Sequence, residues 1–141
     1  MILVFGATGV TGGEVARQLI AAGQRPRVFV RSPEKARGFQ GKAEIVQGDL
    51  SRPDSLVAAM KGVEKVYLVS TGANGPDLEA NAIEAATKTG VKHMVKLSAF
   101  GADNPVLIFS KWHARSEKRL RDSGLQWTMV RPMNFMSNSL G

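Results

Sequence analysis

A glycine-rich segment near the amino terminus restricts the possible folds more than any other part of the sequence. Residues 6–13 read GATGVTGG and follow the apolar run Met1–Phe5, which is typical of a strand buried on both faces. A helix is expected next, over residues 11–22, because apolar residues recur there at helical spacing. A strand, a glycine turn and a helix in this order are typical of the start of a dinucleotide-binding fold.

The three regularly spaced glycines of this turn have different expected roles. Gly6 permits a tight turn out of the strand, Gly9 lets backbone N–H groups approach a pyrophosphate, and Gly12 lets the helix pack closely on the sheet. The helix amino terminus adds free N–H groups and the positive end of its dipole. Thr8 and Thr11 add hydroxyl donors. The alternative is a plain glycine turn without a ligand, and the strand and helix around it favour the pyrophosphate site.

The rest of the chain alternates short apolar runs with longer helical stretches. Strands are expected at residues 1–5, 27–30, 43–47, 63–70, 91–98 and 125–130, and helices at residues 11–22, 33–38, 51–60, 77–89 and 108–122. Ser51 is the expected cap at the start of the third helix. The alternation predicts one NAD(P)-binding domain over residues 1–141, an α/β fold of the Rossmann type. Its doubly wound parallel sheet would have six strands in the order 3-2-1-4-5-6, with helices on both faces.

The composition excludes several kinds of site and partner. The sequence has no cysteine and only two histidines without metal-binding spacing, so we expect no disulfide, no thiolate catalysis and no metal. The net charge is +7, but the basic residues are spread along the chain and aromatic residues make up only 6%, so nucleic acid is not an expected partner. No apolar run reaches the roughly 18 residues of a membrane span. The first residues lack the basic region of a signal peptide, and a cytoplasmic protein is expected.

The end of the second expected strand indicates which dinucleotide the chain prefers. Sites that prefer NAD have an acidic residue there, which holds the ribose 2′-hydroxyl. This sequence instead has Arg31, followed by Ser32, with Lys35 one turn into the next helix. A guanidinium can bind a 2′-phosphate through paired hydrogen bonds and can stack on the adenine. We therefore expect NADP(H) to be favoured over NAD(H), the alternative being an exposed strand-end arginine without a ligand.

A carboxylate follows the third expected strand. Asp49 lies in the segment Gly48–Leu50, where it could accept a hydrogen bond from the adenine amino group. Asp49 is also a residue type that stabilises turns without any ligand. The two interpretations are compatible, because a turn can also present a side chain.

Five segments of the chain together resemble a known family. They are the GATGVTGG turn, Val30–Ser32, Gly48–Leu50, AIEAATKTGVKHMVKLSAFGA at residues 82–102, and SGLQWTMVRPMNFM at residues 123–136. This combination resembles the NmrA-like branch of the atypical short-chain dehydrogenases/reductases. That family includes NADPH-dependent quinone reductases and dye reductases, and also regulators that bind the dinucleotide without turning it over.

The resemblance implies cofactor contacts along the ends of the strands. It assigns the pyrophosphate to Gly6, Thr8, Gly9, Val10, Thr11 and Gly12, the 2′-phosphate to Arg31, and the adenine to Asp49 and Leu50. It assigns the ribose to Ser70, Thr71 and Gly72, and the nicotinamide side to Leu97, Ser98, Pro132, Asn134 and Phe135.

The sequence departs from the resemblance in two respects. The Tyr-x-x-x-Lys pair of many reductases is missing, since the only tyrosine, Tyr67, lies in an expected strand. In its place the long helix carries His113 and Glu117, a His-x-x-x-Glu pattern that resembles the quinone-reductase-like members. Family members are also considerably longer. The resemblance therefore implies that this chain, which ends soon after the sixth expected strand, lacks most of the region that closes the substrate pocket.

The candidate proton donors lie on the long helix. His113 is the first, because the pKa of imidazole lies near neutrality, and Lys111 is the second. Glu117, one turn after His113, could orient the ring or raise its pKa. An ordinary i,i+4 surface pair is an equally weighted alternative. Lys96 is expected near the sheet edge without a catalytic role, and His93 is expected to be structural.

Three functions stay open at this point. The first is an NADPH-dependent reductase that passes a hydride to a quinone or a similar small planar acceptor. The second is a dinucleotide-binding sensor or regulator, and the third is a truncated form that binds nucleotide without turnover. Apolar residues near the end of the chain, Met133, Phe135 and Met136, would lie on an uncovered side of the sheet. Either a homo-oligomer formed through that side or low solubility is therefore expected.

Overall fold

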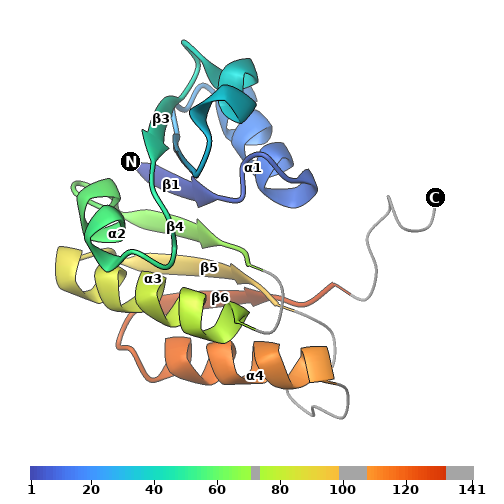
Figure 1. Cartoon of the computed structure of the whole chain (residues 1–141), viewed down its shortest axis with the longest axis vertical. Coiled ribbons are helices and arrows are strands. Elements are labelled where there is room, and N and C mark those ends of the chain that lie inside the picture. The colour runs from blue at the N-terminus through green and yellow to red at the C-terminus, as the bar shows by residue number, and fades with distance from the viewer. Residues whose placement is uncertain (71–73, 99–107, 133–141) are drawn as a thin grey trace.

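The computed structural model describes residues 1–70, 74–98 and 108–132, and it contains a six-stranded parallel sheet. The strands are β1 (Ile2–Phe5), β2 (Arg27–Val30), β3 (Glu44–Gln47), β4 (Lys65–Leu68), β5 (His93–Leu97) and β6 (Gln126–Val130). Their order is β3-β2-β1-β4-β5-β6 (Figure 1). The predicted doubly wound order is confirmed.

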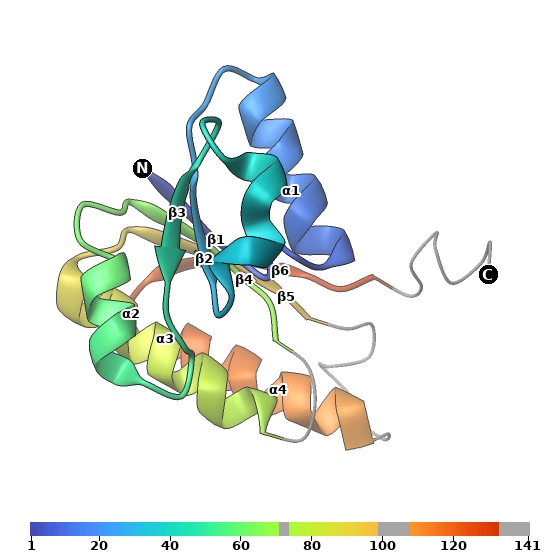
Figure 2. The same ribbon diagram turned by 45° about the horizontal axis from the view of Figure 1, so that its top comes forward.

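Helices cover both faces of the sheet. They are α1 (Val10–Ala21), the 3-10 helix η1 (Pro33–Phe39), α2 (Pro53–Ala59), α3 (Gly75–Thr89) and α4 (Ile108–Arg121). In Figures 1 and 2, α1 and η1 lie on one side of the sheet, and α2, α3 and α4 lie on the other. Each parallel crossover therefore contributes a helical element, as the sequence predicts.

The central strand β1 shows why the first residues form a continuous apolar run. Leu3 and Phe5 pack into the cluster that includes α2 and α3, whereas Val4 packs into the cluster that includes Ala16 of α1. These side chains are at most 1% exposed. Because both faces of β1 are covered, no polar residue can alternate with the apolar ones.

The edge of the sheet differs from the sequence expectation. Strand β5 is paired on both sides, with β4 and with β6, and β6 forms the edge on this side of the sheet. Lys96 on β5 is therefore not near the sheet edge, and its side chain is fully buried. On β6, Trp127 and Val130 are exposed by 42% and 41%.

The turn after β3 also differs from the expectation. Arg52, rather than Ser51, occupies the N-cap position of α2. Both the backbone N–H and the hydroxyl of Ser51 donate to Asp49 Oδ1, at 2.8 Å each. Ser51 is therefore part of the turn that the Asp49 side chain stabilises, and its hydroxyl does not cap α2. The predicted Ser51 cap is wrong.

The glycine turn brings α1 into backbone contact with the end of β1. Gly6 has a φ of +69°, which favours glycine. A Cβ on Gly12 would lie 2.2 Å from the carbonyl oxygen of Gly6 and 2.7 Å from that of Phe5. These are the conformational roles that the sequence predicts for Gly6 and Gly12.

Gly12→Ala is expected to lower the free energy of unfolding by about 2–3 kcal/mol, because the added methyl group must displace backbone rather than a flexible side chain. Urea unfolding measures the effect. Gly38→Ala is the matched control, since a Cβ on Gly38 meets nothing within 4 Å and the change should stay within about 0.5 kcal/mol. Equal unfolding free energies for the two variants would contradict this account of the turn.

Candidate functional site

A cleft of about 420 Å³ opens at the carboxyl ends of β1, β2, β3 and β4. All carboxyl ends of a parallel sheet meet at one edge, so residues far apart in the sequence converge there. Six of the predicted cofactor residues are among those that line the cleft: Gly6, Thr8, Arg31, Asp49, Leu50 and Ser70. The structure therefore brings together Gly6 and Thr8 of the predicted pyrophosphate residues, Arg31 for the 2′-phosphate, both predicted adenine residues and Ser70 of the predicted ribose residues.

The first turn of α1 is suited to an anion. Gly9 precedes the helix in an extended conformation, and its N–H donates to the carbonyl of Gly6 at 2.9 Å. The first N–H groups of a helix have no intrahelical acceptor, and the first turn of α1 carries no acidic residue. Val10 is 70% exposed and Thr11 is half-buried. The turn therefore offers backbone donors with little side-chain obstruction.

The cleft has an aromatic floor. The rings of Phe5 and Phe29 lie 4.8 Å apart between their centroids, and both line the cleft. A Cβ on Gly48 would lie 2.4 Å from the Phe29 ring. The glycine of the Gly48–Leu50 segment thus lets the Phe29 ring occupy this space. The two rings are tilted by 52° to each other, and together they give the cleft an apolar floor against which a base could pack.

Positive charge gathers beside the cleft at the end of β2. A second hollow, of about 560 Å³, is lined by residues that include Arg31, Asp49 and Arg52. The pKa of Asp49 is lowered, mainly by the hydrogen bonds from Ser51 and then by the charges of Arg31 and Arg52. Arg52 was not predicted from the sequence, although its position three residues after Asp49 places it near the carboxyl end of β3.

Lys35 lies in a different hollow from Arg31. This hollow measures about 490 Å³, runs between α1 and η1, and is lined by residues that include Thr8, Gly9, Arg17, Lys35 and Lys42. Ser32 is half-buried at the start of η1. Lys35 is therefore beside the glycine turn, whereas Arg31 lines the main cleft.

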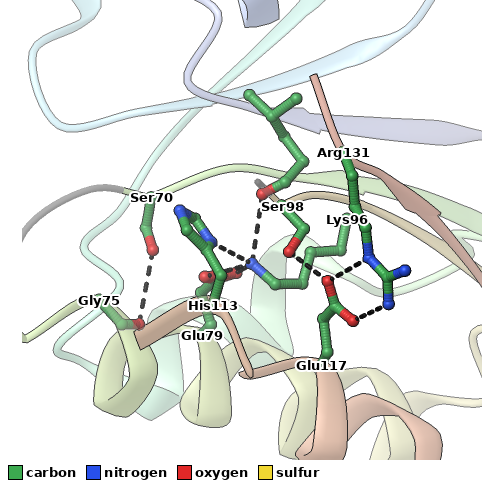
Figure 3. Close-up of polar contacts among 9 residues, drawn as sticks. Ser70, Gly75, Glu79, Lys96, Ser98, His113, Glu117 and Arg131 are labelled. Carbon is green, nitrogen blue, oxygen red and sulfur yellow. Dashed lines mark hydrogen bonds and ion pairs between the residues drawn. The ribbon is translucent and has the colours of Figure 1, made fainter. Parts of the chain in front are cut away.

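A buried cluster of charged side chains lies between β5, α3 and α4 (Figure 3). Lys96 Nζ donates to both carboxylate oxygens of Glu79 at 2.9 Å and to the carbonyl of Leu97 at 3.2 Å. It also lies 3.2 Å from His113 Nδ1. Burial raises the pKa of Glu79, and the charge of Lys96 opposes that rise. Sequence reasoning missed Glu79, whose place on the face of α3 that meets the sheet was the available signal.

A second set of contacts centres on Glu117, which is only 1% exposed. The carboxylate accepts hydrogen bonds from Ser98 Oγ, from Arg131 Nε at 2.9 Å and from Arg131 Nη2. Arg121 Nη1 approaches it at 3.3 Å. Burial alone would raise the pKa of Glu117, but the hydrogen bonds from Arg131 and Ser98 outweigh burial and lower it. The Ser98 hydroxyl is thus bonded to a protein carboxylate.

The expected pairing of His113 with Glu117 is not found. The His113 ring faces Lys96, whereas the Glu117 carboxylate faces Ser98 and Arg131. Within residues 108–132, no hydrogen bond joins His113 to Glu117. The surface-pair alternative is also wrong, because Glu117 is buried. Burial and the charge of Lys96 lower the pKa of His113 to about 4, and the opposing effect of Glu117 is smaller. The ring is therefore neutral at pH 7, contrary to the expected pKa near neutrality.

Some of the remaining predicted residues lie in the described part of the chain, and the others lie outside it. Lys111 is exposed on α4, Leu97 is buried at 8% exposure, and Pro132 is half-buried. His93 Nε2 lies 2.8 Å from Thr128 Oγ1, which links β5 to β6 as a structural residue would. Outside the described residues lie Thr71, Gly72, Met133, Asn134, Phe135 and Met136.

The part of the chain that the structure describes contains neither a metal-binding group of side chains nor a membrane-crossing helix. Across residues 1–70, 74–98 and 108–132, no group of three or more His, Cys, Asp or Glu residues could hold a metal ion. Within the same ranges, no helix has the length and apolar character needed to cross a membrane.

Comparison with known proteins gives a consistent result. Residues 6–140 match a family model described as NAD(P)H-binding. The chain is 42% identical to a (4-alkanoyl-5-oxo-2,5-dihydrofuran-3-yl)methyl phosphate reductase of Streptomyces griseus over 99% of its own length and 50% of the relative's. It is 34% identical to an NmrA-like family domain-containing oxidoreductase of Aspergillus flavus over 92% of this chain and 46% of the relative.

A solved structure is similar over nearly the whole chain. The NADPH-dependent quinone oxidoreductase QOR2 of Escherichia coli, in complex with NADPH, superposes with a TM-score of 0.92 at 32% identity. The match covers 99% of this chain and 51% of that one. The chain thus spans about half the length of the relatives it matches. The predicted NmrA-like resemblance is confirmed.

Replacing Glu117 tests the second set of contacts. Glu117→Gln is expected to lower the free energy of unfolding at pH 7 by about 3 kcal/mol, because Arg131 loses its buried charge partner. Since the folded-state pKa is depressed, this stabilisation is present above the ordinary value of 4.5 and is lost as the pH falls through the lower folded-state pKa. Urea unfolding at several pH values should show the difference between wild type and variant shrinking below pH 4.5.

Glu84→Gln provides the control for this comparison. Glu84 forms an i,i+4 pair with Lys88 on the exposed side of α3, so its replacement should cost less than about 0.5 kcal/mol. A loss for Glu117→Gln no larger than that of Glu84→Gln would contradict the structural role of Glu117.

Proposed function

The chain belongs to the NAD(P)H-binding family, and we propose that it is an NADPH-dependent reductase that passes a hydride to a quinone or a similar planar acceptor. The observation that carries this proposal is the cleft at the carboxyl ends of β1–β4, where a glycine turn, an arginine, a carboxylate and an aromatic floor converge. That is the edge at which doubly wound sheets bind dinucleotides.

The glycine turn fits a pyrophosphate. A Cβ on Gly9 would meet the Gly6 carbonyl at 3.3 Å, and the residue is exposed, so the absence of a side chain leaves the backbone of the turn open. The N–H groups at the start of α1 and the hydroxyls of Thr8 and Thr11 would hold the phosphate oxygens. The adenine would lie against Leu50 and the phenylalanine floor, within reach of Asp49.

The charges at the end of β2 support NADPH over NADH. Arg31 lines the cleft, and Arg52 lines the neighbouring hollow with it. A 2′-phosphate between two guanidinium groups would gain charge-assisted hydrogen bonds that a 2′-hydroxyl cannot make to the same extent. The E. coli neighbour bound to NADPH supports the same preference.

Hydride transfer requires little of the protein beyond holding NADPH and the acceptor in the correct relative positions. NADPH supplies the hydride once it is bound. His113 would assist at the acceptor oxygen, because a neutral imidazole can polarise a carbonyl by donating a hydrogen bond. The lowered pKa of His113, about 4, keeps the ring in this neutral form at pH 7. The relatives already described, a (4-alkanoyl-5-oxo-2,5-dihydrofuran-3-yl)methyl phosphate reductase and a quinone oxidoreductase, support a reductase function.

The proposed activity is tested by following NADPH oxidation with a panel of quinones and azo dyes. Oxidation that depends on the acceptor is expected, and His113→Ala should lower kcat by about 10²-fold while NADPH affinity is unchanged. Lys111→Ala, two residues earlier on α4, is the matched variant and should keep kcat. Loss of activity in Lys111→Ala alone would move the donor role to Lys111. NADPH binding without oxidation across the panel would favour the regulator instead.

Nucleotide preference is tested with Arg31→Asp. The variant should weaken NADPH binding by about 10- to 100-fold, because a charge-assisted pair becomes a repulsive one, and NADH binding should change little. Calorimetric titration measures both affinities. Arg25→Asp makes the same change of charge before the opposite end of β2 and should affect neither dinucleotide. An equal loss for NADPH and NADH in Arg31→Asp would contradict the assignment.

A further inference from the structure

The side chain of Lys96 is fully buried, although an ammonium group is costly to remove from water. Its position on β5 places it between α3, which carries Glu79, and α4, which carries His113 (Figure 3). Such a group is kept in a protein interior only when its protons are all bonded. The partners of Lys96 therefore decide what it does.

The hydrogen-bonding capacity of Lys96 fixes the proton on the histidine ring. An ammonium group has three donors and no acceptor. The Glu79 carboxylate and the Leu97 carbonyl can only accept. The two Glu79 oxygens, both 2.9 Å from Nζ, share one donor, and the Leu97 carbonyl takes a second. The third donor faces His113 Nδ1 at 3.2 Å. A proton on Nδ1 would point at the ammonium protons, so this nitrogen must present its lone pair.

The same result follows if the proton of the ammonium passes to Glu79. The neutral amine would then accept from the Glu79 carboxylic acid, and its two remaining N–H groups would still face Leu97 and His113. The direction of the bond to Nδ1 does not depend on which member of the pair holds the charge.

We propose that Lys96, held by Glu79, is a positioning residue that keeps the ring proton of His113 on Nε2. This inference rests on the proposed reductase function and deepens it. In Figure 3 the second ring nitrogen of His113 is turned away from Lys96. The ring then presents a fixed N–H donor on that side, which is the group that an acceptor oxygen needs.

Among the residues that the structure describes, charged groups lie near this ring on each of the elements packed around it. Glu79 lies on α3, Lys96 on β5, Glu117 on α4 and Arg131 after β6. Glu117 is neutralised by Arg131 and Arg121, and Glu79 by Lys96. The hydrogen bond from Lys96 is therefore the contact that distinguishes the two ring nitrogens.

The tautomer is measured directly by nitrogen NMR. The chain has two histidines, so His93→Gln leaves the His113 ring as the sole imidazole signal in ¹⁵N-labelled protein. Long-range proton–nitrogen spectra at pH 7 should show protonated Nε2 and unprotonated Nδ1, with no exchange between tautomers. A protonated Nδ1, or a mixture of the two forms, would overturn the proposal.

A paired variant tests whether Lys96 is the cause. Lys96→Met with Glu79→Leu removes both charges together, so no buried charge is left unpaired. We expect a mixture of tautomers, a His113 titration midpoint that moves up from about 4, and a lower kcat at unchanged KM. A single Nε2–H form with an unchanged midpoint would refute the role of Lys96. If the double variant does not fold, Lys96→Met alone serves, because Glu79 can take up a proton.

The NMR measurement is made without NADPH or acceptor. A protein that shows the Nε2–H form but oxidises no NADPH would refute the proposed reductase function and leave the positioning by Lys96 intact. A protein that oxidises NADPH but shows a mixture of His113 tautomers would refute the positioning by Lys96 and leave the proposed reductase function intact.

Discussion

The backbone contact between Gly12 and the end of β1 is the constraint on which the rest of the molecule depends. A Cβ on Gly12 would lie 2.2 Å from the Gly6 carbonyl oxygen, so helix α1 can begin here only if this residue is glycine. The contact places the amino end of α1 directly at the carboxyl edge of the sheet. Parallel pairing of β2, β1 and β4 then brings Arg31 and Ser70 to the same edge. One backbone contact thus positions the glycine turn beside the charges and the apolar floor that complete the cleft.

A second region depends on buried charges rather than on close backbone packing. Strand β5 and helices α3 and α4 are joined by Glu79, Lys96, Ser98 and Glu117, and Arg131 extends the contacts to the end of β6. Opposite charges are matched within the cluster, which is what allows so many ionisable groups to be buried together. The cluster lies at the carboxyl ends of β5 and β6, next to the strands that form the cleft. The fold therefore places the cleft at the carboxyl ends of β1–β4 and the candidate donor His113 along one edge of one sheet.

The sequence allowed the strand order and both helical layers to be predicted, because these follow from local patterns. It also pointed to six of the residues that line the cleft, of which Leu50 and Ser70 came only from the family resemblance. Gly6, Gly12 and Arg31 are recognisable from their distance to an apolar run. The partners of His113 were not predictable in the same way. Spacing of four residues suggested Glu117, but tertiary packing turned His113 toward Lys96 and Glu117 toward Arg131. The position of Lys96 was also missed, because an isolated lysine in an apolar run carries no sign of a carboxylate seventeen residues earlier.

The most direct test of the central claim is a titration of ¹⁵N-labelled protein with NADP⁺, followed by backbone amide chemical shifts. If the cleft at the carboxyl ends of β1–β4 holds the dinucleotide, the largest changes fall on Gly6, Thr8, Gly9, Arg31, Leu50 and Ser70. The outward surfaces of α3 and α4, around Asp77 and Lys118, should be unaffected. Absence of any shift, or shifts that gather on α3 and α4 instead, would contradict the account.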